Sequence, residues 1–338
     1  MPNALASIGW NEDVAAAVEA AQQPDATPGR VSRVDRGIVT VLTADGAVRA
    51  ARGVELPATG DWVLVEGDDE RVVATVLPRR SAFVRGDPMD GWARNAQVVA
   101  SNVDTVFVTQ SLDTGVKLRR LERELVLAFE SGADPVIVLT KADLVTGVVD
   151  IATVAGSAAG APVLVTSAVT GSGVDDLRRY TGPGRTVALV GASGVGKSTL
   201  VNVLVGDEVR ETGAVRETDQ RGRHTTTARE LVLLPGGGVL IDTPGLRAVT
   251  LWVADDGFRR AFAEIEALAA GCRFHDCAHD REPGCAVQQA VAEGRLDAAR
   301  VAHYRELDAE LDRVAIRDAE RERAARAGRR PRRSRELS

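Results

Sequence analysis

Two nucleotide-binding motifs occur in this chain in an unusual order. Residues 191–198 read Gly-Ala-Ser-Gly-Val-Gly-Lys-Ser, which fits the phosphate-binding pattern GxxxxGK[ST]. The segment 140–143 reads Thr-Lys-Ala-Asp, which looks like a guanine-recognition element, and it lies upstream of the phosphate loop. In an ordinary domain of this kind the phosphate loop comes first. The inverted order predicts a circularly permuted GTP-binding domain.

Apolar runs of β type alternate with helical stretches from about Val98 onward. The runs are 103–109, 135–140, 162–166, 186–190 and 239–241, and the clearest helical stretches are 118–130 and 197–205. This alternation predicts a parallel sheet covered by helices on both faces. Ligands of such sheets bind beyond the carboxyl ends of the strands, which is where each nucleotide motif lies.

The phosphate loop has the strand, loop and helix context that its chemistry requires. The run 186–190 leads directly into Gly191, and Lys197 opens the next helix. Its glycines let backbone N–H groups converge on phosphate oxygens, and the helix N-terminus adds its dipole. We expect Lys197 to reach the β- and γ-phosphates and Ser198 to ligate Mg²⁺. The predicted phosphate-side contacts are Gly191, Ala192, Ser193, Gly194, Val195, Gly196, Lys197, Ser198 and Thr199.

The segment 242–245, Asp-Thr-Pro-Gly, follows another apolar run and supplies a DxxG element. In this element we expect Asp242 to contact Mg²⁺ through water and Gly245 to sense the γ-phosphate.

The base element consists of Thr140, Lys141, Ala142 and Asp143. The Asp143 carboxylate can accept hydrogen bonds from guanine N1 and N2, a pattern that adenine cannot offer. Ser167 and Ala168 follow a further strand and can place a backbone N–H against guanine O6. The usual first residue is Asn, and the shorter hydroxyl of Thr140 cannot reproduce every amide hydrogen bond. We therefore expect GTP to be preferred, with weaker guanine affinity but preserved discrimination.

The N-terminal part of the chain has a different pattern. Residues 1–29 are Ala-rich and end in Pro and Gly, which predicts a flexible leader. Residues 30–80 contain five short β-type runs and an Asp45-Gly46 hairpin signal, which predicts an OB-type barrel. Such barrels often bind nucleic acid, but eight Arg and eight acidic residues in this segment leave no basic groove visible from composition. A barrel that only packs beside its neighbour is the alternative.

A metal-binding pattern lies between residues 272 and 285. Cys272, Cys277, His279 and Cys285 include all three cysteines of the chain and one of its four histidines. Three thiolates and one imidazole complete a closed tetrahedral Zn²⁺ shell, which is typical of a structural site. Clustered Cys is more often metal than disulfide in a cytosolic protein, and free buried thiols are the alternative. His275 would crowd this loop, so we expect it at the surface or facing RNA.

The motif order, together with residues 222–227 (Gly-Arg-His-Thr-Thr-Thr) between the phosphate loop and DTPG, gives the chain a family resemblance. It resembles the circularly permuted, ribosome small subunit-dependent GTPases that act in assembly of the bacterial 30S subunit. The resemblance covers roughly residues 30–310 and supports the choice of the four zinc ligands. It implies a permuted P-loop GTPase domain with an N-terminal OB-type barrel and a C-terminal helical zinc-binding domain. It also implies the 30S subunit and its 16S rRNA as partners.

Hydrolysis of GTP needs a group that orients the attacking water. Many relatives of this fold carry Gln after the DxxG glycine, but here that position is Leu246, which cannot hydrogen-bond. We therefore expect slow hydrolysis in the free protein and stimulation by a partner. His224 is the candidate for orienting the water, with a role in RNA contact or loop packing as the alternative. Thr226 is the candidate Mg²⁺ ligand, with Thr225 and Thr227 as close alternatives.

The C-terminal part combines a helical stripe with a basic tail. Leu296, Arg300, Tyr304, Leu307 and Leu311 recur at helical spacing, and Gly328 and Pro331 favour an end to the helix. Residues 321–335 contain eight Arg and one Glu, which gives this segment a charge of +7. Because the net charge of the whole chain is −6, the remaining residues carry −13. Such a tail is either a solvated terminus or a phosphate-seeking arm that gives salt-dependent affinity for RNA.

These patterns predict five segments: 1–29 (leader), 30–80 (barrel), 81–250 (GTPase domain), 251–320 (zinc and helical domain) and 321–338 (basic tail). The chain has no apolar run long enough to span a membrane and no basic residue before Glu19 that would suggest a secretory signal. We expect a cytoplasmic monomer that binds GTP and GDP with Mg²⁺. The alternatives to a GTPase are a small-molecule phosphotransferase and an RNA-binding scaffold with a structural, non-hydrolysed nucleotide.

Overall fold

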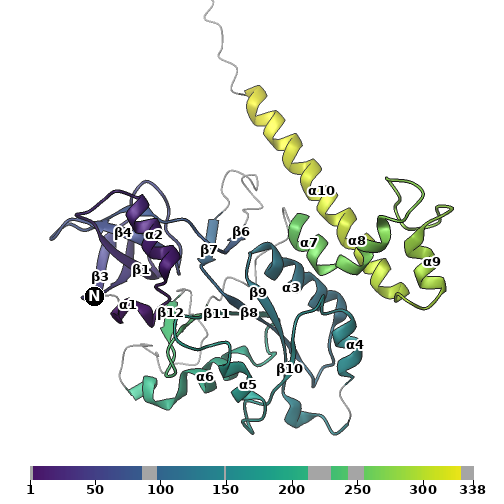
Figure 1. Cartoon of the computed structure of the whole chain (residues 1–338), viewed down its shortest axis with the longest axis horizontal. Coiled ribbons are helices and arrows are strands. Elements are labelled where there is room, and N and C mark those ends of the chain that lie inside the picture. The colour runs from purple at the N-terminus through teal and green to yellow at the C-terminus, as the bar shows by residue number, and fades with distance from the viewer. Residues whose placement is uncertain (1–2, 86–96, 148–149, 212–229, 243–254, 329–338) are drawn as a thin grey trace, which may run out of the picture. The chain divides into compact units, whose positions relative to one another are not determined.

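The computed structural model describes residues 3–85, 97–147, 150–211, 230–242 and 255–328 (Figure 1). Two compact units divide the chain. The first holds the N-terminal helices, the barrel and the sheet with the nucleotide motifs, and the second holds the cysteine cluster and the C-terminal helices. Within these residues, no helix is both long and apolar enough to cross a membrane.

Five strands close into the predicted small barrel. They are β1 (Thr27–Val34), β2 (Ile38–Thr43), β3 (Gly46–Ala51), β4 (Trp62–Glu66) and β5 (Val72–Val76). They pair in the order β1-β2-β3-β5-β4, and β4 returns to pair with the first half of β1. Side chains from all five strands fill the interior, namely Val31, Val39, Val41, Ala50, Val63, Val65, Val73 and Val76. Small and β-branched residues suit the narrow space inside such a barrel.

Residues 3–20 differ from the flexible leader that we predicted. They form α1 (Asn3–Ala6) and α2 (Glu12–Ala20), and the Asn11 side chain caps α2 by accepting from the Val14 N–H at 3.0 Å. Leu5, Ile8 and Val14 are buried in one cluster with Trp62 of the barrel. The Ala-rich composition that suggested a loose segment is also the composition of a good helix. The apolar side chains between the alanines then fix these helices against the barrel.

Six strands form the sheet that carries the nucleotide motifs, in the order β10-β9-β8-β11-β13-β12. They are β8 (Thr105–Ser111), β9 (Asp134–Thr140), β10 (Val163–Val165), β11 (Thr186–Gly191), β12 (Glu230–Leu233) and β13 (Val239–Asp242). The five predicted strands are parallel. The additional strand β12 is antiparallel to β13 and was not predicted, because four residues are too few to show a period.

Helices cover this sheet, and the two helices predicted from the sequence, over 118–130 and 197–205, are both present. The helix α3 (Leu118–Glu130) packs on β8 and β9, and α4 (Ile151–Gly156) lies beside β10. The helices α5 (Val174–Arg178) and α6 (Lys197–Glu211) share one core cluster with residues of β8, β9, β11 and β13. Gly206 interrupts α6 with φ 71° and ψ 170°. The apolar faces of these helices therefore hold the strand ends where the motifs lie.

The barrel and the sheet share backbone hydrogen bonds. After an irregularity between Val31 and Arg33, β1 pairs with β12 at Arg33 and Glu230. The strands β6 (Ala82–Arg85) and β7 (Gln97–Ser101) form a separate pair between the barrel and β8 in the sequence. The strand order of the main sheet thus continues from the nucleotide motifs into the barrel.

Arg30 is buried at this junction. Its guanidinium donates to the carbonyls of Ile8, Gly60 at 3.1 Å and Asn102 at 3.1 Å, and it lies 5.5 Å from the centre of the Trp62 ring. Burial lowers the pKa of Arg30 to about 10, so the side chain stays charged at neutral pH. One cation therefore satisfies carbonyls from the turn between α1 and α2, the barrel and the segment before β8.

The second unit is helical. It contains most of α8 (Ala263–Ala269), with α9 (Ala286–Ala292) and α10 (Ala298–Gly328), while most of α7 (Asp255–Ala261) belongs to the first unit. On α10, Arg300, Tyr304 and Leu307 of the predicted stripe are buried. The Arg300 guanidinium pairs with Glu264, and the Tyr304 hydroxyl donates to Glu266 at 2.7 Å. These contacts favour packing as the role of the stripe.

Candidate nucleotide site and metal centre

The phosphate loop lies between the end of β11 at Gly191 and the start of α6 at Lys197. Gly191, Gly194 and Gly196 have φ values of 144°, 80° and 99°. A Cβ atom at Gly191 would lie 2.4 Å from the carbonyl oxygen of Thr109 on β8, so only glycine fits where these two strands end together. The loop geometry therefore depends on the packing of the neighbouring strand as well as on its own sequence.

The outer face of this loop is open. Ser193, Gly194, Ser198 and Thr199 are exposed, whereas Val195 is buried. The Lys197 ammonium donates to the carbonyls of Gly191 at 2.9 Å and of Ala192. Lys197 thus lies over its own loop, where a phosphate group would meet it, and the Ser198 hydroxyl is available to a cation on the same side.

Asp242 is the last residue of β13, the strand next to β11. The carboxyl ends of these two parallel strands place Asp242 on the same edge of the sheet as the phosphate loop. Several other predicted residues of the γ-phosphate side lie outside the described residues. These are Gly245 and Leu246 after the DxxG aspartate, and His224, Thr225, Thr226 and Thr227.

The two base segments come together as predicted. Asp143 lies in a short 3₁₀ turn (η1, Ala142–Leu144) directly after β9. The Ser167 hydroxyl donates to Asp143 Oδ1, and the Ala142 N–H donates to the Thr166 carbonyl at 3.1 Å. The Asp143 side chain is exposed, so its other oxygen can accept from a ligand. This arrangement places the Asp143 carboxylate beside the backbone of 167–168, where the Ser167 N–H donates to the Ser172 carbonyl at 2.9 Å.

Thr140 makes a contact that the sequence did not predict. Its buried hydroxyl lies within hydrogen-bonding distance of two carbonyls, those of Gln110 at 3.2 Å and of Val195 in the phosphate loop. The base element and the phosphate loop therefore touch directly. The only sequence signal for this contact is the departure from Asn at position 140.

A buried polar pair lies behind Thr140. The Gln110 side chain donates to Glu124 Oε2 at 2.7 Å, and Arg120 donates to the other oxygen at 3.0 Å. Burial raises the pKa of Glu124, while the hydrogen bond from Arg120 opposes this shift. Because the Gln110 carbonyl also faces Thr140, this network joins α3 to the nucleotide site.

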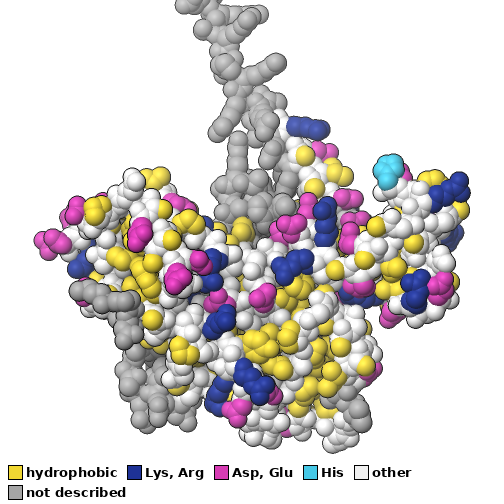
Figure 2. Space-filling model, in the orientation of Figure 1, with side chains coloured by type: hydrophobic (Ala, Val, Ile, Leu, Met, Phe, Trp, Pro, Cys, Tyr) yellow, Lys and Arg dark blue, Asp and Glu magenta, His cyan; other side chains and the backbone are white. Residues whose placement is uncertain are grey.

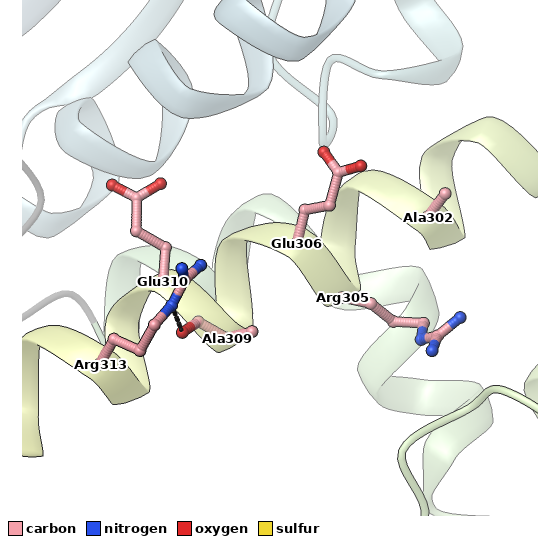
Figure 3. Close-up of a pocket in the computed structure, with 6 residues that line it drawn as sticks. All are labelled: Ala302, Arg305, Glu306, Ala309, Glu310 and Arg313. Carbon is pink, nitrogen blue, oxygen red and sulfur yellow. Dashed lines mark hydrogen bonds between the residues drawn. The ribbon is translucent and has the colours of Figure 1, made fainter.

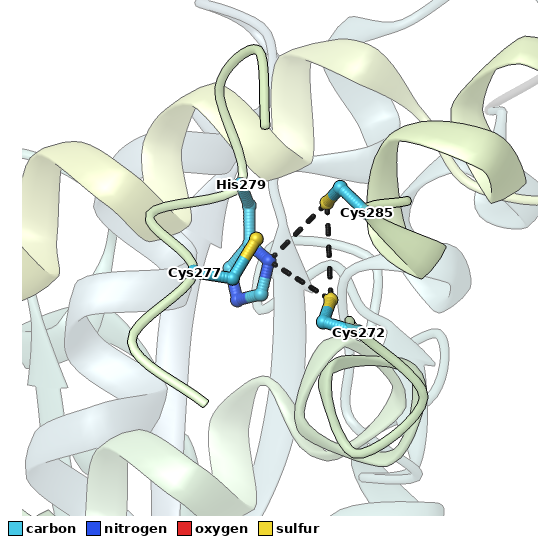
Figure 4. Close-up of side chains that lie close together, drawn as sticks. All are labelled: Cys272, Cys277, His279 and Cys285. Atoms are coloured by element: carbon cyan, nitrogen blue, oxygen red, sulfur yellow. Dashed lines mark hydrogen bonds between the residues drawn. The ribbon is translucent and has the colours of Figure 1, made fainter. Parts of the chain in front are cut away.

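The four predicted metal ligands form a compact cluster (Figure 4). The His279 Nδ1 atom lies 3.6 Å from Cys272 Sγ and 3.5 Å from Cys285 Sγ, and these two sulfur atoms are 3.9 Å apart. A tetrahedral shell with Zn–S of about 2.3 Å and Zn–N of about 2.1 Å requires S···S separations of about 3.8 Å and S···N separations of about 3.6 Å. All four ligand atoms lie within 4.8 Å of one another, so the donor set fits Zn²⁺.

The surroundings act in opposite directions on two of the thiols. Desolvation by burial works to raise the pKa of Cys272, but backbone hydrogen bonds from Ala286 and Val287 lower it overall, whereas desolvation raises the pKa of Cys277 to about 11. The Gln288 N–H points at Cys285 Sγ at 3.4 Å, at the start of α9. The predicted non-ligand His275 is exposed and lies outside the cluster.

A hollow of about 600 Å³ lies along α10 (Figure 3). Its lining consists of Ala302, Arg305, Glu306, Ala309, Glu310 and Arg313, all from one helix. Arg305 pairs with Asp280 at 3.0 Å, and Arg313 donates to the Ala309 carbonyl at 2.8 Å. The lining of this hollow carries both acidic and basic side chains, and its two arginines already have partners within the protein. We therefore assign no ligand to it.

The charges on the barrel agree with its composition. On the face shown in Figure 2, basic and acidic side chains are interspersed over the barrel rather than gathered in one stripe. The basic residues 329–338 of the tail lie outside the described residues.

Comparison with known proteins gives consistent matches over most of the chain. A family model described as RsgA GTPase matches residues 76–252. A protein of Streptomyces coelicolor named small ribosomal subunit biogenesis GTPase RsgA is 48% identical, over 95% of this chain and 90% of that protein. A protein of the same name from Xanthomonas axonopodis pv. citri is 43% identical, over 97% of this chain and 95% of its own length.

Two solved structures are similar to this fold. The crystal structure of YjeQ from Thermotoga maritima has a TM-score of 0.62 and 25% identity, covering 85% of this chain and 98% of that one. YloQ, described as a circularly permuted GTPase, has a TM-score of 0.61 at 24% identity, covering 86% of this chain and 96% of its own. The permuted fold predicted from the motif order is therefore confirmed.

Proposed function

The chain belongs to the RsgA family and is a GTPase, and we propose that it acts on the small ribosomal subunit late in that subunit's maturation. The observation that carries the nucleotide part is the meeting of segments 140–143, 166–168 and 191–197 at one edge of a parallel sheet. The names of the relatives support the small ribosomal subunit as the partner, and we propose its 16S rRNA as the surface bound.

The geometry supports a role for each described residue in hydrolysis. Lys197 exchanges its carbonyl partners for β- and γ-phosphate oxygens, since a charged phosphate is a stronger acceptor than a peptide carbonyl. Ser198 and Thr226 would hold Mg²⁺, with Asp242 acting through water. When bound, that ion supplies charge neutralisation on the phosphate oxygens. Asp143 and the backbone of Ser167 and Ala168 would select guanine.

Hydrolysis by the free protein should be slow and should accelerate on the small subunit. Leu246 cannot orient water, so the orienting group must be another residue or belong to the partner. We propose His224 for this role and Gly245 as the sensor of the γ-phosphate. Subunit-stimulated turnover that is unchanged in His224→Ala would remove the histidine from the mechanism.

The direct test measures phosphate release from GTP and from ATP, with and without purified small subunits. The proposal expects phosphate release from GTP and not from ATP, and it expects the subunits to raise the rate of this release strongly. If no release occurs under any of these conditions, the protein is an RNA-binding scaffold with a structural nucleotide. Release that requires an added small acceptor would identify a phosphotransferase.

The base pocket has its own test. Asp143→Asn should shift preference from GTP toward xanthosine triphosphate, because the amide reverses the hydrogen-bonding pattern offered to the base. Unchanged GTP affinity in this variant would place the base pocket elsewhere.

We also propose that one structural Zn²⁺ occupies Cys272, Cys277, His279 and Cys285. In this proposal the barrel, the zinc-binding unit and the basic tail beyond Arg321 hold rRNA while the nucleotide sets the conformation. The protein would act as a monomer in the cytoplasm. A stable dimer in sedimentation at micromolar concentration would contradict the monomeric state.

A further inference from the structure

We propose that Asp113 is a positioning residue of the guanine subsite, which anchors the ammonium group of Lys141 and thereby fixes this lysine side chain across the phosphate loop. The proposal rests on the function proposed above for segment 140–143. Asp113 belongs to no nucleotide motif of the sequence, and it follows β8, the strand between β9 and β11.

The backbone of Lys141 is in a conformation that lysine rarely adopts. Its φ and ψ of 59° and 39° are left-handed. Residues with a Cβ atom adopt such a conformation at a cost in free energy, and glycine or asparagine would adopt it at less cost. A lysine at this position therefore indicates that its side chain is needed where the turn directs it.

The course of the side chain can be followed from its contacts. Lys141 Cε lies 4.0 Å from the point where a Cβ atom of Gly196 would stand, and Thr140 Oγ1 lies 3.5 Å from the same point. Beyond this crossing, the Lys141 Nζ atom donates to Asp113 Oδ2 at 2.8 Å. The lysine stem thus passes over the phosphate loop at Gly196 and is held at its far end.

Asp113 is itself fixed. Its other oxygen accepts from the buried hydroxyl of Ser111, and the Leu112 N–H donates to the Thr140 carbonyl at 3.0 Å. The hydrogen bonds from Lys141 and then from Ser111 lower the pKa of Asp113, so it is ionised at neutral pH. Both oxygens of the carboxylate therefore have defined donors, which fixes the direction in which it meets the ammonium.

The ion pair does little for stability, because its two side chains are 30% and 24% exposed and water screens their attraction. Its effect is on geometry. An unanchored ammonium would keep several rotamers and could turn toward the phosphates beside Lys197, whereas the anchored one leaves an ordered apolar stem beside Asp143. That stem forms a fixed wall against which a guanine ring can lie.

The test compares two ligands in full-length variants. Asp113→Ala and Asp113→Asn should raise the Kd for GDP about tenfold, the equivalent of 1.4 kcal/mol. Asp113→Glu should recover part of the affinity. Inorganic tripolyphosphate, which contacts only the phosphate side, should bind the variants at least as tightly as the unaltered protein, because a released Lys141 ammonium can turn toward it. In GTP hydrolysis, KM should rise while kcat stays unchanged.

The matched control is Asp176→Asn, which removes another acid that pairs with an arginine at 3.2 Å on the exposed side of α5. It should leave GDP and tripolyphosphate binding unchanged. Equal losses for both ligands in Asp113→Asn, or no loss for GDP, would overturn the positioning role. If the unaltered protein binds GDP no better than ADP, the proposed base element fails. If it prefers GDP and Asp113→Asn keeps full affinity, only the inference about Asp113 fails.

Discussion

The cysteine cluster and the nucleotide site are assembled from the sequence in opposite ways. All four metal ligands lie between residues 272 and 285, and their donor atoms are within 4.8 Å of one another. The nucleotide site collects the ends of β8, β9, β10, β11 and β13, which are spread between residues 111 and 242. The first site is specified by local spacing, whereas the second exists only when the sheet has its full strand order.

The two sites also differ in access. His279 and Cys285 are buried, and three thiolates and one imidazole complete a tetrahedral shell, as expected of a structural metal. In the nucleotide site, Ser193, Ser198 and Asp143 are exposed, so a ligand can enter and leave. Changes that act on one site should therefore leave the other intact.

Removing a metal ligand should have the largest effect. Cys277→Ser should abolish zinc binding and destabilise the second unit, because a structural zinc ion contributes directly to folding. Zinc content by metal analysis and the protease resistance of residues 264–328 measure these two losses. GDP affinity should stay within about twofold, since the nucleotide site belongs to the first unit.

The control for this change is His275→Ala, which alters an exposed residue of the same loop. It should retain zinc. Zinc lost from His275→Ala and kept by Cys277→Ser would reverse the ligand assignment.

Filling the closest approach in the nucleotide site should have the next largest effect. Gly191→Ala places a methyl group 2.4 Å from the Thr109 carbonyl oxygen and strains a residue at φ 144°. A cost of about 3 kcal/mol would weaken GDP binding roughly hundredfold, as measured by calorimetry. Zinc content should not change.

Gly160→Ala is the matched control, because Gly160 also has positive φ, at 80°, but nothing lies within 4 Å of the added carbon. Its GDP affinity should equal that of the unaltered protein. If both variants bind GDP equally well, the strand contact at Gly191 does not shape the loop.

The contrast between local and long-range assembly also decides what the sequence could predict. The helix over 118–130, the five parallel strands and the cysteine spacing each have a period or pattern within a few residues. The N-terminal helices were mistaken for a leader because their order depends on burial against Trp62, far away in the sequence. The strand β12 was not predicted, because it is defined by its pairing with β1 and β13 and not by a pattern in its own four residues.

The nucleotide site likewise combines local motifs with contacts between distant residues. Its motifs were recognisable one by one, since each follows a strand. The contacts between motifs were not, because Thr140 meets Val195 and Lys141 meets Asp113 only after β8, β9 and β11 are aligned. Sequence spacing carries no record of such contacts.

A smaller effect is expected where two motifs meet. Thr140→Val keeps the shape of the side chain but removes the hydroxyl that faces the Gln110 and Val195 carbonyls. The loss of one hydrogen bond of about 1 kcal/mol should raise the Kd for GDP roughly fivefold. Thr140→Ser keeps the hydroxyl and should bind GDP almost normally. Equal affinity of the Val and Ser variants would show that the hydroxyl does not link the two motifs.

The smallest effect is expected at Glu124, which accepts a hydrogen bond from Gln110, the residue whose carbonyl contacts Thr140. Burial raises its pKa above the usual 4.5, so the folded protein binds this proton more tightly than the unfolded chain does. Its contribution to stability is therefore greatest below pH 4.5 and declines as pH rises through the folded pKa. Glu124→Gln removes this titration and still accepts a hydrogen bond from Gln110, so the variant should lose that decline.

Urea unfolding between pH 4.5 and 7 measures the difference. At pH 7 the Gln variant should be as stable as the unaltered protein to within about 1 kcal/mol. Asp150→Asn is the control, because hydrogen bonds from Thr153 lower the pKa of Asp150 from its usual 3.8 and its contribution is lost only as pH falls below this range, so the variant should leave the pH dependence between 4.5 and 7 unchanged. If Glu124→Gln leaves the pH dependence of unfolding unaltered, the buried carboxylate is not linked to folding. The hydrogen-bond network that starts at Thr140 would then extend no further than Gln110, whose carbonyl contacts Thr140.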